Sequence, residues 1–202
     1  YCFGCHESGD IFSLIMKKEG VDFSTAVEIL AKKAGVELEE ASSSYNKDEA
    51  KKRREEKENL YDLYSRLSNA FHYLLVSSKE GDNAREYLKK RNVSQEMIEK
   101  FQLGYAPFNK DWLYNFLKNK GYSDAFLKQS GLFSQKSEKW PLFRGRLMFP
   151  IRDRQGRTIA FSGRDLTGDE KAPKYINSPE TQIYQKKENY FGLYEAKNTI
   201  SE

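Results

Sequence analysis

The chain begins with two short amphipathic patterns, and each of them predicts a helix. In the first, Asp10 is the expected N-cap and Gly20 the expected end. In the second, Ser24 is the expected N-cap and Gly35 the expected stop. The apolar residues of this second helix are spaced i, i+3, i+4 and i+7, as on one helix face: Val27, Leu30, Ala31 and Ala34.

A polar and highly charged segment separates these helices from a longer amphipathic pattern. Residues 41–59 contain few side chains that a core could bury, so we interpret residues 39–59 as a solvated linker that runs into a helix. From Leu60 onward, apolar residues return with a helical period as far as Leu75. Shorter helical patterns follow over residues 84–91, 94–101, 111–121 and 123–131.

Near residue 141 the apolar period changes from about 3.6 to 2, which indicates β-strands. Two alternating stretches flank the segment DRQGR, and this arrangement predicts a β-hairpin with a three-residue loop and a left-handed Gly156. Pro150 inside the first stretch indicates an edge strand or a bulged one. Helices early and strands late, without βαβ alternation, predict an α+β fold in which short helices precede an antiparallel sheet.

The predicted loop also sets a register, because it pairs Asp153 with Arg157. In that register one face of the hairpin is apolar and carries Leu147, Phe149, Ile151, Ile159 and Phe161. The other face has Arg146 directly opposite Arg164, with Arg152 further along, and opposed like charges are mildly destabilising. Two interpretations stay open: the arginines splay into water, or an anion such as phosphate lies between them.

The overall charge becomes informative only when it is located along the chain. The 202 residues carry a formal net charge of +4. Between Trp140 and Lys187, ten Lys and Arg residues stand against five Asp and Glu residues, which favours a polyanionic partner. The sequence contains no apolar run of about 18 residues, the length that a membrane span requires, so we expect no membrane partner. With only two cysteines, we expect a cytoplasmic location.

A second cationic segment follows the hairpin. In KAPKYINSPET (171–181), Lys174, Tyr175 and Asn177 lie close together in a short extended stretch, and Lys186 follows a few residues later. Cations with an interleaved aromatic and an amide are the side chains that hold phosphates, stack bases and contact sugars. This segment therefore favours phosphate as the anion between the two arginines. An ordinary sheet aromatic is the competing interpretation of Tyr175.

The two cysteines of the chain, Cys2 and Cys5, form a C-x-x-C motif at its start. The motif is typical of one knuckle of a zinc ribbon, and a tetrahedral zinc site requires two further ligands. His6 directly follows Cys5, where it is poorly placed to complete such a site. We therefore expect half of a zinc site, in a chain that is a fragment of a longer polypeptide.

Taken together and in order, several segments resemble the bacterial (DnaG-type) DNA primase family. They run from residue 1 to about 197 and read CFGC-x-x-SGD, YL-x-x-R, F-x-LGYAP, RGRLMFPIRD-x-x-GR-x-IAFSGR and PKYINSPET-x-x-Y-x-K. The stretches LMFPIRD and KYINSPET are long and distinctive. One departure is Asn92, which stands where the family usually has glycine after YL-x-x-R, so the turn at this position is in question.

The resemblance implies three parts. Residues 1–38 resemble the C-terminal part of a zinc-binding domain, a partial zinc ribbon with two helices in which Cys2 and Cys5 are zinc ligands. Residues 39–59 are then the charged linker. Residues 60–202 resemble the N-terminal basic subdomain of the RNA polymerase domain, with short helices followed by a twisted antiparallel sheet. The acidic, metal-binding Toprim subdomain of the family has no counterpart in these residues.

In the family, the basic subdomain lines a groove that guides template DNA and the RNA–DNA hybrid. The resemblance carries this nucleic-acid-binding role to the residues at matching motif positions: Arg91, Arg146, Arg164, Lys174, Tyr175, Asn177 and Lys186. Spacing alone also indicates the cations of this set, except Arg91. No catalytic residue is expected within the 202 residues, because the metal-binding carboxylates of the family belong to the acidic subdomain.

The implied activity is that of a DNA primase, a DNA-directed RNA polymerase that makes short RNA primers for replication. Its substrates are NTPs and a single-stranded DNA template, and its metals are Zn²⁺ and Mg²⁺. A replicative helicase is the implied partner, through a C-terminal domain not present here. Because phosphoryl transfer needs metal ions to align its reactants, we expect these residues alone to be inactive.

Two other functions are compatible with the residues themselves. The first is a non-catalytic zinc-ribbon module that binds nucleic acid in a replication or mobile-element protein. The second is an interaction domain whose basic face binds an acidic protein partner. Salt-dependent binding to single-stranded DNA separates the first of these from the second.

Overall fold

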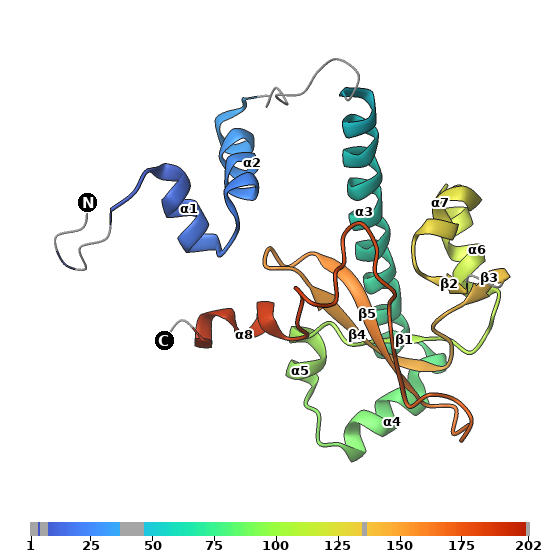
Figure 1. Cartoon of the computed structure of the whole chain (residues 1–202). Helices are drawn as coiled ribbons and strands as arrows, with labels where there is room; N and C mark the ends of the chain where they lie inside the picture. Colours follow the sequence, from blue (N-terminus) through green and yellow to red (C-terminus); the bar gives the residue numbers. More distant parts are fainter. Residues whose placement is uncertain (1–3, 5–7, 37–46, 135–136, 201–202) are drawn as a thin grey trace. The chain divides into compact units, whose positions relative to one another are not determined.

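The computed structural model describes residues 4, 8–36, 47–134 and 137–200, and these fall into two compact units, Tyr1–Arg53 and Arg54–Glu202 (Figure 1). Cys2 and Cys5, which carry the predicted zinc knuckle, lie outside the described residues. Within the described ranges, no group of three or more His, Cys, Asp or Glu side chains is arranged to hold a metal ion.

The first unit contains the two predicted N-terminal helices, α1 (Ile11–Glu19) and α2 (Phe23–Ala34). The Asp10 carboxylate caps α1 by accepting the Ser13 N–H at 2.8 Å, and α1 ends at a left-handed Gly20, both as predicted. The predicted Ser24 cap of α2 is wrong. Asp22 caps this helix through the Thr25 N–H at 2.8 Å, so that Ser24 lies inside the first turn.

Helix α3 (Lys47–Ser77) begins inside the segment that we interpret as a linker. Residues 51–59 of α3 are mostly charged and exposed, and the buried face of the helix starts at Leu60. Although α3 is 31 residues long, no helix among the described residues is long and apolar enough to cross a membrane. The division of the chain at residues 38 and 59 stays a prediction.

The second unit combines short helices with antiparallel strands, and this confirms the α+β prediction. After α3, its elements are η1 (Lys79–Gly81), α4 (Asp82–Lys90), α5 (Gln95–Lys100), β1 (Gly104–Ala106), α6 (Trp112–Asn119), α7 (Asp124–Gln129), β2 (Phe133–Ser134), β3 (Ser137–Pro141), β4 (Arg146–Arg152), β5 (Thr158–Asp165), β6 (Tyr175–Asn177) and α8 (Leu193–Ile200). A four-stranded sheet has the order β1-β4-β5-β6, and β2 pairs with β3 in a separate ribbon.

The β4–β5 hairpin has the predicted loop but not the predicted register. The Asp153 N–H donates to the Arg157 carbonyl at 3.0 Å, and Gly156 is left-handed with φ of +86°. A bulge between Ile151 and Arg152 then shifts the pairing by one residue over the rest of β4. As a result Arg146 pairs with Asp165, and the predicted opposition of Arg146 and Arg164 is wrong.

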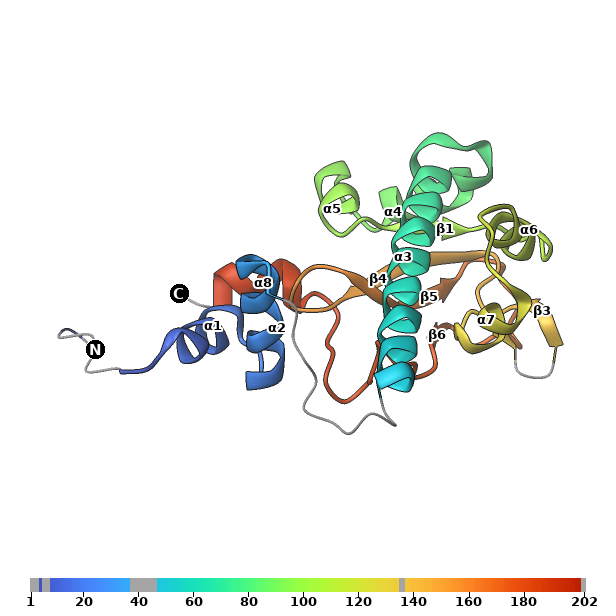
Figure 2. The ribbon, with the colours of Figure 1, turned by 90° about the horizontal axis from the view of Figure 1, so that it is seen from above.

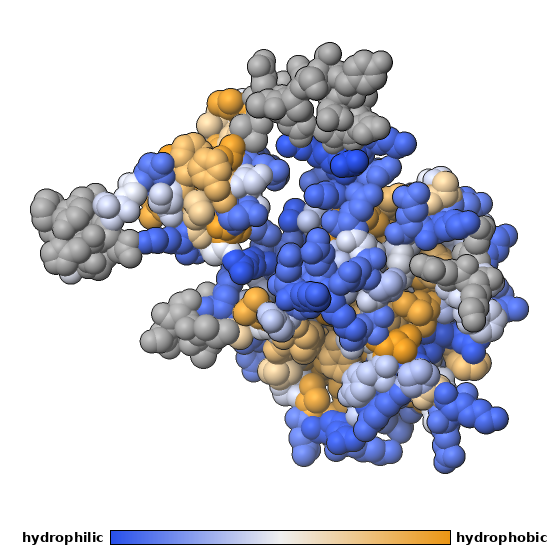
Figure 3. Space-filling view, in the orientation of Figure 1, coloured by the Kyte–Doolittle hydropathy of each residue, from blue (hydrophilic) through white to orange (hydrophobic). Residues whose placement is uncertain are grey.

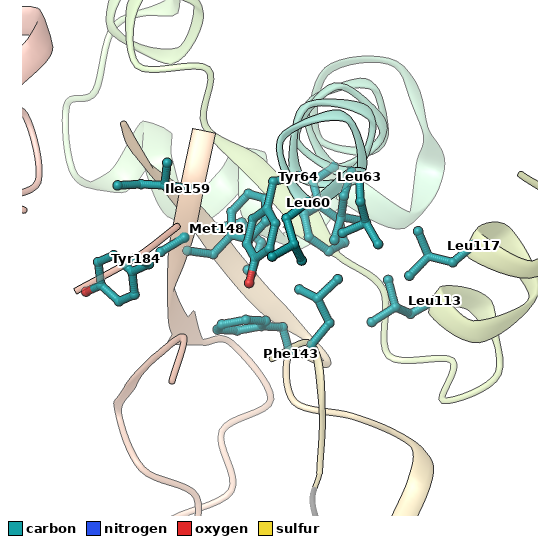
Figure 4. Packing of buried hydrophobic residues seen from close by; sticks show 14 of the residues in the cluster. Leu60, Leu63, Tyr64, Leu113, Leu117, Phe143, Met148, Ile159 and Tyr184 are labelled. Atoms are coloured by element: carbon teal, nitrogen blue, oxygen red, sulfur yellow. The ribbon is translucent and has the colours of Figure 1, made fainter. Parts of the chain in front are cut away.

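The shifted register also corrects the prediction of a single apolar face. Met148 and Phe161 pack into the larger core with α3, whereas Leu147 belongs to a second core with residues of α4 and α5. Because neighbouring residues of a strand point to opposite faces, β4 is buried on both. Helix α3 runs across the strands (Figure 2). Figure 4 shows Leu60, Leu63 and Tyr64 of α3 close to other core side chains, namely Leu113 and Leu117 of α6, Phe143, and Met148 of β4.

Pro150 lies in β4 beyond the last residue that pairs with β1, which is Met148. The side of β4 that faces β1 is therefore unpaired where the proline lacks an N–H. Strand β4 is an inner strand and not an edge strand, and of the two predicted alternatives the bulge is confirmed, between Ile151 and Arg152. Hydrophobic side chains reach the surface by α5 and α8 (Figure 3). There the Phe191 ring lies 5.7 Å from that of Phe101 and 5.8 Å from that of Phe149.

Replacement of Phe161 by alanine tests the larger core. The Phe161 ring is fully buried, and its centroid lies 5.5 Å from those of Tyr64 and Phe71. We expect Phe161→Ala to lower the free energy of unfolding by about 3–5 kcal/mol, measured by chemical denaturation. Tyr73→Ala removes an aromatic that is 63% exposed, and its expected effect is within about 0.5 kcal/mol. Equal effects of the two variants would contradict this packing.

Candidate nucleic-acid interface

The C-terminus of α4 positions Arg91, the first of the predicted site residues. Arg91 is the exposed C-cap of the helix, and its guanidinium carbon lies 5.5 Å from the centre of the Tyr87 ring, one turn earlier. Asn92 follows with φ of +56°, and the Val93 N–H donates to the Leu88 carbonyl at 3.1 Å. Asparagine tolerates the left-handed conformation better than most residues, so the turn is kept without glycine.

Arg164 of β5 extends this arrangement onto the sheet. Its guanidinium carbon lies 4.3 Å from the centre of the Tyr87 ring and 5.9 Å from that of Tyr175, its partner on β6. Arg91, Tyr87, Arg164 and Tyr175 therefore alternate cation and aromatic, and we call these four residues the cation–aromatic row. Tyr175 is 52% exposed, which argues against an ordinary sheet aromatic.

Strand β6 presents Asn177 beside the row. Asn177 is exposed and pairs with Ser162, so it shares a face of the sheet with Tyr175 and Arg164. Ile176 faces the other way and packs on the larger core. The buried Ser178 fixes the end of β6, because its N–H donates to the Phe161 carbonyl at 2.8 Å and its hydroxyl accepts the Phe161 N–H at 3.0 Å.

The two predicted lysines are placed differently. Lys174 directly precedes β6, and its carbonyl accepts the Asp165 N–H at 2.9 Å, so it adjoins the row. Lys186 lies further along the chain, where its backbone N–H donates to Glu180 at 3.2 Å. Both lysines are exposed, and neither ammonium group makes an ion pair or hydrogen bond with another described residue. The described contacts do not join Lys186 to the row.

Arg146 occupies a different environment from the one predicted. It is 6% exposed, and its guanidinium donates to the Gly163 carbonyl at 3.1 Å and to the Pro173 carbonyl at 2.9 Å. Asp165 lies 3.7 Å from it, so the negative charge beside Arg146 comes from the chain itself. Burial lowers the pKa of Arg146, and the nearby Asp165 carboxylate opposes this change.

Gly163 makes room for the buried arginine. A Cβ atom at this position would lie 3.1 Å from Cδ of Arg146 and 2.7 Å from the ring of Phe143. A side chain at residue 163 would therefore clash with Phe143 and crowd the arginine side chain where it crosses β5. The arginine reaches Pro173 and ties the segment before Lys174 to the sheet.

The structure adds Tyr87 to the residues that the sequence indicates. Its ring lies between the two arginines of the row and packs against the second core. The spacing of Tyr87 and Arg91 at i and i+4 on a helix was the available signal. A set of cations and rings that is exposed at Arg91 and Tyr175 can hold phosphates and stack bases, whereas the described residues show no carboxylate cluster suited to metal-dependent chemistry.

Comparison with known proteins identifies related sequences along the chain. The sequence model of the DNA primase catalytic core, N-terminal domain, matches residues 71–197, and that of the CHC2 zinc finger matches residues 1–46. The DNA primase of Borreliella burgdorferi is 39% identical over 199 residues, which cover 96% of this chain and 37% of the relative. The DNA primase of Enterococcus faecalis is 38% identical, and this chain covers 33% of its length. The chain thus spans about a third of the length of these curated relatives.

Two solved structures are similar to the chain. One, described as the DnaG primase catalytic domain bound to ssDNA, has a TM-score of 0.64 and 37% identity, with 74% of this chain and 46% of that chain covered. The other comprises the zinc-binding and RNA polymerase domains of the Aquifex aeolicus primase. It has a TM-score of 0.63 and 35% identity, with 98% of this chain and 46% of that chain covered.

Replacement of Arg146 tests its structural role. Arg146→Met leaves the Gly163 and Pro173 carbonyls without their donor and Asp165 without its nearby cation, so we expect the free energy of unfolding to fall by about 2–4 kcal/mol. Arg154→Met is the matched control, because Arg154 is exposed in the hairpin loop and makes no described contact. Chemical denaturation compares the two, and an equal, small effect of both would show that Arg146 is not a structural tie.

Proposed function

Because the chain belongs to the DnaG-type family of bacterial DNA primases, we propose that it is part of a DNA primase and holds nucleic acid for that enzyme. The observation that carries this proposal is the cation–aromatic row at the β6 edge of the sheet, in which Arg91 and Tyr175 are exposed and Tyr87 and Arg164 are half-buried. A structure with 37% identity to this chain is described as bound to single-stranded DNA, which supports the same ligand here.

The row suits a flexible polyanion better than a small ligand. Arg91 and Arg164 supply positive charge on both sides of Tyr87, and the exposed ring of Tyr175 offers a face on which a base can stack. The exposed ammonium group of Lys174 adds a phosphate contact beside the ring. Asn177 can donate to or accept from a sugar or base edge. Such contacts bind a strand largely independently of its base sequence.

Arg146 has a supporting role in this proposal. Its hydrogen bond to the Pro173 carbonyl holds the backbone next to Lys174, so it positions the lysine and Tyr175. Lys186 remains a candidate phosphate contact for a longer strand, since its ammonium group is free among the described residues.

The metals and the other partners follow from the family. The CHC2 zinc finger match over residues 1–46 supports Cys2 and Cys5 as two zinc ligands. We further propose that the whole protein uses NTPs and Mg²⁺ to extend an RNA primer along single-stranded DNA, that it holds an RNA–DNA hybrid, and that it binds a replicative helicase. The match of residues 71–197 to a catalytic-core domain favours this function over a non-catalytic binding module.

Binding to single-stranded DNA is the direct test. We expect the 202-residue chain to bind a labelled single-stranded oligonucleotide in a salt-dependent manner, measured by fluorescence anisotropy. The double variant Lys174→Ala, Tyr175→Ala loses a phosphate contact and a stacking face, so its salt slope should fall by about 0.7 and its affinity by at least about fivefold. The pair Lys57→Ala, Tyr73→Ala removes the same side-chain types from exposed positions of α3 and should bind normally. Unchanged binding by the first pair would contradict the proposed site.

Primer synthesis is a separate test of the division of labour. The described residues contain no group of acidic side chains that could hold Mg²⁺. We therefore expect the 202-residue chain to make no RNA from NTPs on a single-stranded template at any Mg²⁺ concentration. A family member that contains the Toprim subdomain is the positive control. RNA synthesis by the 202-residue chain would show that it carries its own catalytic centre.

A further inference from the structure

Arg144 lies just before β4 and is the first residue of the segment RGRLMFPIRD, but the resemblance assigns it no nucleic-acid-binding role. Its guanidinium carbon is 4.6 Å from the centre of the Trp140 ring and 4.7 Å from that of Phe108. Both rings are unusually exposed for their size, at 44% for Trp140 and 59% for Phe108. Two large aromatic rings at the surface thus pack against one guanidinium group.

The N–H groups of Arg144 have no partner among the described residues, although the side chain is half-buried. The other arginines near this end of the sheet differ, since Arg146 donates to two carbonyls and Arg164 to the Asp165 carbonyl. A planar cation that is held by rings and keeps its donors unused is preorganised for a planar pair of oxygen atoms, such as those of a phosphate.

The backbone around Arg144 is held firmly in place. The Gly145 N–H donates to the Pro107 carbonyl at 3.3 Å, and its carbonyl accepts the Leu166 N–H at 3.1 Å. Gly145 is left-handed, and a Cβ atom there would lie 2.6 Å from the side chain of Thr167. The backbone next to Arg144 is therefore fixed by hydrogen bonds to the segments on both sides of it.

The same backbone connections place Arg144 at the end of the sheet that carries the cation–aromatic row. Arg146, two residues later, pairs with Ala106 and Asp165, and the Asp165 N–H donates to the carbonyl of Lys174. The Asp165 carboxylate does not neutralise Arg144, because it faces Arg146 and accepts from the N–H and the hydroxyl of Thr167. A cation with free donors thus lies at the same end of the sheet as Lys174.

We propose that Arg144, framed by Phe108 and Trp140, is an additional phosphate-binding site for the single-stranded nucleic acid that crosses this end of the sheet. The proposal rests on the proposed function, which supplies the strand. Arg144 makes the contact, and the two rings are positioning residues that keep its fork oriented. A surface arginine packed on two rings for stability alone is the opposing account.

The test compares salt slopes for a labelled single-stranded oligonucleotide bound to the 202-residue chain. Each phosphate contact on single strands contributes about 0.7 to the slope of log K against log salt. We expect Arg144→Gln to lower the slope by about 0.7 and to weaken binding severalfold at low salt. Arg154→Gln removes the same charge from the loop at the opposite end of the β4–β5 hairpin and should keep the wild-type slope. A wild-type slope for Arg144→Gln would overturn the proposal.

Two further variants keep the test decisive if Arg144→Gln does not fold, which circular dichroism would reveal. Arg144→Lys keeps the charge but lacks the fork, so the slope should persist while affinity falls. Phe108→Ala with Trp140→Ala should likewise weaken binding at an unchanged slope, because the charge remains and its orientation is lost. Wild-type affinity of both variants would overturn the proposal. Failure of the wild-type chain to bind at all would instead refute the proposed function.

Discussion

Burial of the β4–β5 hairpin on both faces is the constraint on which the rest of the second unit depends. Phe161 and Met148 lie in the core under α3, and Leu147 lies in the core formed with α4 and α5. A charged side chain within such a hairpin must find partners inside the protein or reach the end or edge of the sheet. The bulge between Ile151 and Arg152 sets the register of the hairpin. The register in turn decides which arginine finds partners inside the protein and which reaches the end or edge of the sheet.

The arginines of this region divide accordingly. Arg146 is buried and satisfied by carbonyls, and Arg152 pairs with Glu195 of α8 at 2.9 Å. Arg164 faces the short strand β6 instead and reaches the surface between two tyrosines. The positive charge counted along the sequence is therefore not all available to a ligand. The contacts that we propose for a polyanion come mainly from the part at the end and edge of the sheet, near Lys174 and Tyr175.

Much of the local structure could be predicted from the sequence, because it depends on short-range signals. Asp10, Gly20 and Gly156 occupy the predicted caps and turn. The register could not be predicted, because a one-residue bulge leaves no mark in an alternating pattern that is apolar on both faces. Strand β1 was missed for a related reason, since three residues are too few to show a period.

The sequence indicates some members of the candidate site but neither Tyr87 nor the geometry. The motif positions indicate Arg91, Arg164 and Tyr175, and the structure brings these residues together around Tyr87. The assignment of Arg146 to an exposed arginine pair failed because it followed from the wrong register. The motif RGRLMFPIRD contains Arg144 but does not indicate its setting between two rings, because these rings lie 36 and 4 positions before it and meet only in the folded chain.

Hydrogen exchange with and without a single-stranded oligonucleotide tests the central claim most directly, because it needs no substitution. The account predicts that bound DNA slows amide exchange at the end of α4, in residues 162–165 and in residues 173–177, where the cation–aromatic row lies. The hairpin loop around Arg154 should exchange at the same rate in both states. Protection confined to other segments, with β6 and the end of α4 unchanged, would contradict the claim that this edge of the sheet holds nucleic acid.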